Sequence, residues 1–243
     1  MATAMRLDRR QPASALAVYA HPDDPEVSCG GTLARWALDG AAVHLVIINR
    51  GEKGVADPGV EPDALAARRA DEVAGAAAVL GLAGWELLGL PDGESENDLA
   101  LRERLVAIVR RLRPEVVVGP DPTALYFGDG WVNHRDHRVC GFAVLDAVAP
   151  AAASPRYFPE AGPPHQVQAL YLTGTLEPDT AVAITDVLDV KARALACHRS
   201  QLGGLADGSG ELVHELVEQR AVEAGRALGV PHAETFRVLR LSG

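Results

Sequence analysis

The segment Ala-Leu-Ala-Val-Tyr-Ala-His-Pro-Asp-Asp, residues 15–24, decides the fold. Six largely apolar residues run up to a polar turn, which is the pattern of a short buried strand. His21 then lies just beyond the carboxyl end of that strand, at the edge where open α/β sheets bind ligands. The segment therefore predicts an α/β sheet with a ligand site beside His21.

Strand and helix patterns alternate along the chain after this segment. We expect strands and helices in turn over residues 43–48, 63–80, 85–88, 99–112 and 116–118. A helix is also expected to begin with Thr32 near its N-cap position and to end at Gly40. Such alternation implies a Rossmann-like α/β fold, in which a mostly parallel sheet is covered by helices on both faces.

The C-terminal part is expected to form a small α/β cap on the same domain, so that residues 1–243 make one unit. It contains a loop, two strands and two helices, over 150–166, 167–172, 181–184, 188–199 and 211–228. This part is too short to bury a large core of its own. The last helix and a strand around Phe236 could provide the surface of a homo-oligomer.

Composition excludes several classes of partner. A formal net charge of -10 would repel nucleic acid and anionic membranes, because both bind basic surfaces. The 3 cysteines include no Cys-x-x-Cys pair and indicate neither a disulfide framework nor a thiolate zinc site. No signal peptide opens the sequence, and no apolar run reaches the roughly 18 residues of a spanning helix. We expect a cytoplasmic protein with a small-molecule partner.

The first motif, His-Pro-Asp-Asp at residues 21–24, offers a metal ligand and a base. Side chains of adjacent residues point in different directions, so only one carboxylate can readily join His21 on a metal. We assign Asp24 as the ligand and Asp23 as the general base that accepts a proton from water. The same four residues, taken alone, also fit an Asx turn that contains a proline.

The second motif, His-Arg-Asp-His at residues 134–137, completes the ligand set. Its histidines are spaced i, i+3 and share one face of a helical turn. One can bind the metal while the other, if protonated, stabilises an oxyanion, and Asp136 could orient a histidine from behind. Two imidazoles and a carboxylate hold a catalytic zinc with an open position for water, although they also suit iron(II). The motifs together predict hydrolysis or hydration chemistry.

Five sequence motifs, spread over roughly residues 14–201, resemble those of the LmbE-like (PIG-L) family of zinc-dependent deacetylases. They read AHPDDPEVSCGGT, R-x-x-E, LGLPDG, HRDH and K-x-x-A-L-x-C-H-R-S-Q. The resemblance implies a Rossmann-like fold and removal of acetyl groups from N-acetylglucosamine-containing substrates, with related enzymes cleaving other amides of amino sugars. It also implies that His21, Asp24 and His137 bind zinc, that Asp23 is the base, and that His134 stabilises the oxyanion.

The resemblance further implies two sugar-binding residues, Arg69 in the R-x-x-E helix and Asp92 in the LPDG turn. Arg68 is a near alternative to Arg69. The competing interpretation is that Arg69 lies on a solvated helix face and pairs with Glu72 at i+3. His198 is a weaker candidate, because a histidine at a helix C-terminus also interacts favourably with the helix dipole.

The sequence departs from the family pattern at two places, of which the first concerns the substrate and the second concerns the rate of the reaction. Pro25 precedes Glu26, which makes the motif HPDDxE rather than HPDDE. Val132 stands where an aromatic residue is often proposed to assist, so either Tyr126 or Trp131 replaces it or the role is missing.

The sequence therefore predicts a zinc-dependent hydrolase that deacetylates an N-acetylglucosamine-type amino sugar or its glycoside. An amidase for a bulkier amino-sugar conjugate and a non-catalytic sugar-binding scaffold are the alternatives. Loops over 50–62 and 120–133 would line the mouth of the site and select the substrate.

Overall fold

The computed structural model describes residues 5–55, 57–202 and 210–241, and eight of its strands form one sheet. Their bounds are β1 Arg6–Asp8, β2 Ser14–Tyr19, β3 Ala42–Asn49, β4 Gly84–Leu90, β5 Val116–Pro120, β8 Ala169–Thr173, β9 Thr180–Ala183 and β10 Ala233–Arg240. The order across the sheet is β1-β9-β10-β8-β5-β2-β3-β4. Strand β10 is antiparallel to both neighbours, and the other pairs are parallel. The predicted mostly parallel sheet is confirmed.

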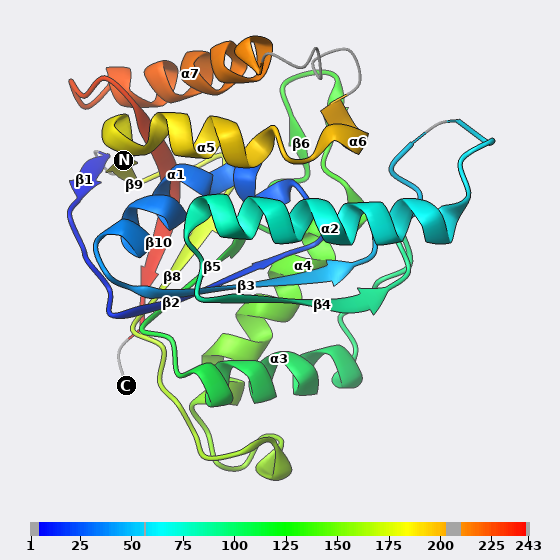
Figure 1. The fold of residues 1–243 in the computed structure, drawn as a ribbon. Helices are drawn as coiled ribbons and strands as arrows, with labels where there is room; N and C mark the ends of the chain where they lie inside the picture. Colours follow the sequence, from blue (N-terminus) through cyan, green and yellow to red (C-terminus); the bar gives the residue numbers. More distant parts are fainter. Residues whose placement is uncertain (1–4, 56, 203–209, 242–243) are drawn as a thin grey trace.

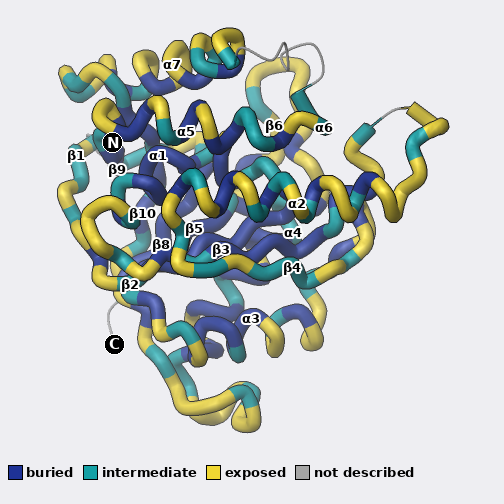
Figure 2. Tube along the Cα trace, in the orientation of Figure 1, coloured by how far each residue is buried: buried dark blue, intermediate teal, exposed yellow. Residues whose placement is uncertain are grey.

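Helices cover both faces of this sheet (Figure 1). One side carries α1 Asp24–Leu38, α2 Pro62–Leu80, α5 Leu188–Leu195 and α7 Glu211–Arg226, and the other carries α3 Leu99–Leu112 and α4 Arg135–Asp146. A short helix, α6 Arg199–Leu202, follows α5. Buried residues form one apolar core on each side of the sheet (Figure 2). None of the described helices is long and apolar enough to cross a membrane.

The C-terminal strands extend the main sheet instead of forming the cap expected for them. Strand β8 pairs with β5, and β10 joins β8 to β9. Phe236, proposed above for a self-association surface, is fully buried and contacts Tyr171 edge to face with ring centroids 5.5 Å apart. That expectation for Phe236 was wrong, because its strand is internal to the sheet.

The topology brings both sequence motifs to one place. From β2 the chain moves outward through β3 and β4, and it then returns to β5 on the other side of β2. The carboxyl ends of β2 and β5 therefore flank the topological switch point, where open sheets bind ligands. His21 follows β2. The loop after β5 forms a hairpin, β6 Tyr126–Phe127 and β7 Trp131–Val132, and then reaches α4.

Helix α1 begins at Asp24, eight residues before the predicted cap at Thr32. Its backbone is broken at Cys29, where φ is -148° and ψ is 19°. Glu234 on β10 receives hydrogen bonds from the backbone N–H groups of Gly31 and Thr32 at 2.9 and 2.7 Å, and from the Thr32 hydroxyl at 2.6 Å. The segment after the break thus begins near Thr32, but a carboxylate about 200 residues away caps it.

Arg110 on α3 organises the Pro-rich segment that follows α4. The side chain is buried, and it donates hydrogen bonds to the backbone carbonyls of Ala151, Ala152, Ser154, Tyr157, Phe158 and Gly162. Carbonyls buried without a partner would be costly, so this guanidinium substitutes for regular secondary structure there.

We expect Arg110→Met to lower the free energy of unfolding by about 3 kcal/mol or more, because it leaves several carbonyls unpaired. The matched control is Arg111→Met, since Arg111 is exposed and pairs only with Glu86 among the described residues. An exposed pair of this kind contributes about 1 kcal/mol or less. Urea denaturation of both variants measures the difference, and equal losses would contradict the assignment.

Candidate active site

Three side chains meet at the switch point with the geometry of metal ligands. His21 Nδ1 lies 3.3 Å from His137 Nε2 and 3.5 Å from Asp24 Oδ2, and His137 Nε2 lies 3.1 Å from Asp24 Oδ1. Ligand atoms about 2.0–2.1 Å from a tetrahedral zinc would lie about 3.3 Å from one another. The donor set and its spacing therefore fit a divalent metal.

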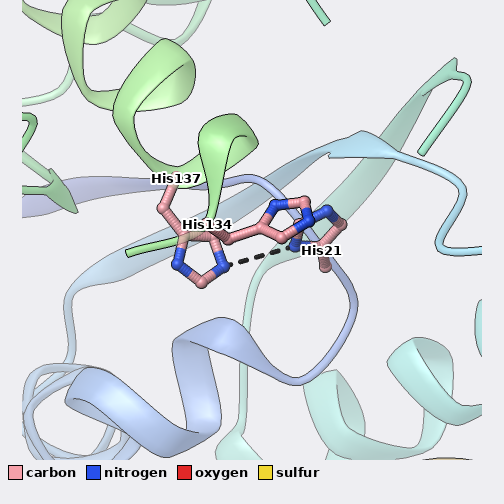
Figure 3. Close-up of side chains that lie close together, drawn as sticks. All are labelled: His21, His134 and His137. Atoms are coloured by element: carbon pink, nitrogen blue, oxygen red, sulfur yellow. Dashed lines mark hydrogen bonds between the residues drawn. The ribbon is translucent and has the colours of Figure 1, made fainter. Parts of the chain in front are cut away.

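His134 lies beside this group but makes a different contact. Its ring centroid is 4.9 Å from that of His21 and 5.6 Å from that of His137 (Figure 3). A nitrogen atom of each of the three rings could reach one ion, so His134 could also approach the metal. However, His134 uses its Nδ1 to accept a hydrogen bond from the Asp136 N–H at 3.2 Å, as the N-cap of α4. This leaves Nε2 to face the site.

Two further carboxylates hold the opposite nitrogen of His21. His21 Nε2 lies 3.3 Å from Asp136 Oδ2 and 3.2 Å from Asp92 Oδ1. The Gly93 N–H donates to Asp136 at 2.7 Å and fixes that carboxylate. A carboxylate of this kind orients a metal-binding imidazole from behind and makes it more basic. Asp136 thus has the position expected for it, and Asp92 lies beside it.

The carboxylates dominate the electrostatics. Burial favours a neutral His21 ring, but hydrogen bonds to Asp136, Asp24 and Asp92 raise its pKa to about 12. Burial likewise favours a protonated Asp24, yet His137 and His21 lower the pKa of that carboxyl. The site therefore binds a positive charge strongly, as a metal site must.

Asp23 occupies an unusual backbone position at the start of α1. Its φ is 92°, in the left-handed region that aspartate adopts more readily than most residues, and such conformations are frequent at active sites. Arg69 Nη2 lies 3.2 Å from Asp23 Oδ1. Burial, with the neighbouring charge of Asp24, raises the pKa of Asp23 to about 7, and Arg69 opposes the shift. A carboxylate with this pKa suits proton transfer near neutrality.

Arg69 is buried and bonds inside the protein through its two terminal nitrogens, while its Nε has no hydrogen-bond partner among the described residues. Besides Asp23 it donates to the carbonyls of Gly51, at 2.9 Å, and of Pro22, and it is only 3% exposed. The competing interpretation, in which Arg69 lies on a solvated helix face and pairs with Glu72, is wrong. Glu72 instead accepts hydrogen bonds from the N–H and hydroxyl groups of Ser200 at 2.8 and 2.7 Å, at the start of α6. Arg68 is exposed on the other face of α2.

The charge state expected for His134 also differs. Burial and the positive charge of His21 lower the pKa of His134, so the ring is neutral rather than protonated. Because Nδ1 accepts a hydrogen bond, the remaining proton is on Nε2. The ring can therefore still donate a hydrogen bond.

Two supporting contacts were missed from the sequence. His137 Nδ1 lies 3.1 Å from Asn133 Oδ1, which directs His137 Nε2 toward the metal ligands. His198 Nε2 lies 3.1 Å from Glu26 Oε2, and both residues are buried, so His198 does not act as a solvated helix cap. The i, i+4 spacing of Asn133 and His137 was an available signal, whereas nothing local pairs Glu26 with His198.

Comparison with known proteins gives relatives over most of the chain. The chain is 32% identical over 226 residues to a diacetylchitobiose deacetylase of Thermococcus kodakarensis. The matched region covers 91% of this chain and 81% of that protein. The chain is 38% identical over 178 residues to a 1D-myo-inositol 2-acetamido-2-deoxy-alpha-D-glucopyranoside deacetylase of Saccharopolyspora erythraea, covering 63% of this chain and 62% of that protein.

A solved structure and a family model agree with these relatives. The N,N'-diacetylchitobiose deacetylase of Pyrococcus horikoshii superposes with a TM-score of 0.83 and 29% identity, over 94% of this chain and 84% of that one. Residues 16–148 match the family model named PIG-L and described as GlcNAc-PI de-N-acetylase. That range contains all eight residues predicted for the site. The chain therefore belongs to the PIG-L family.

Proposed function

We propose that this protein is a metal-dependent hydrolase that removes the N-acetyl group of an N-acetylglucosamine-type amino sugar or its glycoside. The proposal rests on one observation. His21, Asp24 and His137 lie close together, and beside them is the Asp23 carboxyl, whose pKa is raised to about 7. The names of the relatives support the substrate class and favour deacetylation over the alternatives. The products would be acetate and a primary amine.

We assign zinc as the metal, with iron(II) as the other ion that suits the ligands. His21, Asp24 and His137 would hold it, and Asp136 would orient His21. When bound, such an ion lowers the pKa of water toward about 7 and polarises a carbonyl group. The two ring nitrogens lie 3.3 Å apart, and each lies within 3.5 Å of an oxygen of the Asp24 carboxylate.

Asp23 is the proposed general base. It accepts a proton from the attacking water and returns that proton to the nitrogen of the leaving amine. The water oxygen forms a bond to the amide carbon, and the C–N bond then breaks. Arg69 supports this role by holding one carboxylate oxygen from the buried side. Because the Arg69 guanidinium also serves two carbonyls, we assign it to positioning Asp23 rather than to binding sugar.

His134 is the proposed donor to the oxyanion. Its Nε2–H faces the site while its Nδ1 is fixed by α4, so the proton is in place without any change of charge. Asp92 remains the proposed sugar-binding residue. One of its oxygens contacts His21, and the other could accept a hydrogen bond from a sugar hydroxyl.

Asp23→Asn should lower kcat for deacetylation by about 10²- to 10⁴-fold, because the amide cannot accept the proton. Acetate release from diacetylchitobiose measures the loss, and metal content should remain that of the unmodified protein. Asp71→Asn, an exposed site on α2, is the matched control. Turnover within a few-fold of the unmodified protein would refute the base assignment.

Chelation should abolish turnover, and added zinc or iron(II) should restore it. His137→Ala should weaken metal binding by more than about 100-fold, since loss of even a supporting contact costs 10- to 100-fold. Elemental analysis after dialysis reports this independently of activity. His214→Ala, on the exposed face of α7, should retain the metal. Full metal content in His137→Ala would exclude the proposed ligand set.

His134→Asn should lower kcat by about 10²- to 10³-fold, the effect of removing one oxyanion donor. Asparagine is a favourable N-cap, so the start of α4 should be preserved. Thermal unfolding tests that point, and steady-state kinetics tests the catalytic one. A variant with normal kcat would show that the oxyanion is stabilised elsewhere.

A further inference from the structure

A cavity of about 640 Å³ opens beside the proposed metal ligands and is not used by the chemistry described above. Asp24 and His137 contribute to its wall, whereas Asp23 and His134 do not. Its other walls include residues of α1, α5, α7, the β6–β7 hairpin and the ends of β5, β8 and β10. The volume lies in the range of small-molecule binding sites.

The hairpin presents one of its two faces to this cavity. Phe127 pairs with Trp131, and Tyr126 pairs with Val132, across the two strands. Paired residues share a face, and successive residues alternate between faces. Phe127 and Trp131 both line the cavity, and Tyr126 and Val132 do not. Trp131, not Tyr126, is thus the exposed aromatic residue that adjoins the metal ligands.

Trp131 is open to solvent. Its side chain is 69% exposed. Its cross-strand partner Phe127 is partly buried and packs near Gly174, which follows β8. The Phe127 Cζ lies 3.8 Å from the position that a β-carbon on Gly174 would take. An exposed indole offers a large flat surface at a low cost in conformational entropy, because the side chain has only two rotatable bonds. Large exposed aromatics beside a site are a feature of binding surfaces.

The opposite wall is small and polar. On α7, Ala221 and Ala224 leave room, and Arg220 makes no hydrogen bond or ion pair with any residue that the structure describes. Thr173 also lines the cavity, but its hydroxyl already bonds to the Tyr19 hydroxyl and the Gly119 carbonyl, so Arg220 is the group offered to a ligand. An aromatic surface facing hydrogen-bonding groups suits a ring with an apolar C–H face and a rim of hydroxyls, as in a sugar or a cyclitol.

Substrate chemistry places such a ring here. In a glycoside of N-acetylglucosamine, the carbon that bears the glycosidic oxygen adjoins the carbon that bears the amide nitrogen. A substrate whose amide carbon is at the metal ligands therefore has its second ring within a few ångströms of them. The cavity next to Asp24 and His137 lies within that reach.

We propose that this cavity is the binding site for the second ring of a glycoside substrate, and that stacking on Trp131 makes the protein prefer glycosides to free N-acetylglucosamine. The inference rests on the proposed deacetylase function. It assigns Trp131 a role in specificity rather than in the reaction itself.

Trp131→Ala should lower kcat/KM for diacetylchitobiose by about tenfold, as expected for loss of an aromatic stacking contact. The loss should be in KM, with kcat unchanged, and kcat/KM for free N-acetylglucosamine should change less than twofold. Tyr126→Ala is the matched control, because Tyr126 is 62% exposed on the other face of the same hairpin and should leave both substrates unaffected. Trp131→Phe should recover part of the preference.

Three results would overturn the inference while the deacetylase function stands. One is that Trp131→Ala leaves kcat/KM for diacetylchitobiose unchanged, and another is that it lowers kcat/KM for both substrates equally. Neither result fits a site for the second ring. A third is that Trp131→Ala changes the preference between N-acetyl and N-butanoyl glucosamine but not the preference for a glycoside. That result would show that the cavity binds the acyl group. If the unmodified protein deacetylates none of these compounds, the proposed function itself fails.

Discussion

The site depends on one electrostatic constraint: three carboxylates, those of Asp24, Asp92 and Asp136, surround a single buried imidazole. Buried negative charges are costly unless a positive charge is close. His21 supplies that charge as a proton, because hydrogen bonds to the three carboxylates raise its pKa against the opposing effect of burial. A divalent ion would meet the same requirement. The sheet topology makes this possible, because the two segments that carry these groups converge only where β2 and β5 lie side by side.

The C-terminal part of the chain supports this site from behind. Glu234 caps the second segment of α1, and Lys191 on α5 neutralises it across 2.5 Å. His198 contacts Glu26 in the first turn of the same helix. Helix α1 is therefore held by residues from β10, from α5 and from the turn between α5 and α6. These lie outside the segment that matches the family model, so the matched segment contains the site but not its full support.

Local patterns predicted most strands and helices well. Helix α3 has the predicted bounds, and both motifs lie at strand ends because apolar runs and turn residues are local signals. The errors arose where long-range contacts decide. Nothing in the sequence near Thr32 shows that Glu234 will cap it. Nothing near Arg69 shows that Glu72 will accept a hydrogen bond from Ser200 instead. The lowered pKa of His134 depends on the charge of His21, which is distant in the sequence. The roles of the site residues, the single domain, the cytoplasmic location and the choice of zinc stay predictions.

Asn133 connects the β6–β7 hairpin to the proposed metal ligand His137. Its N–H and side-chain amide bond to the carbonyls of Leu125 and Ala124, which closes the base of the hairpin, and its side-chain oxygen orients His137. The hairpin tip beyond this closure carries no ligand of the metal. Its sequence can therefore drift or be exchanged by loop grafting while the reaction centre keeps its shape. Changes confined to the hairpin would therefore alter what binds beside the proposed centre without moving its ligands.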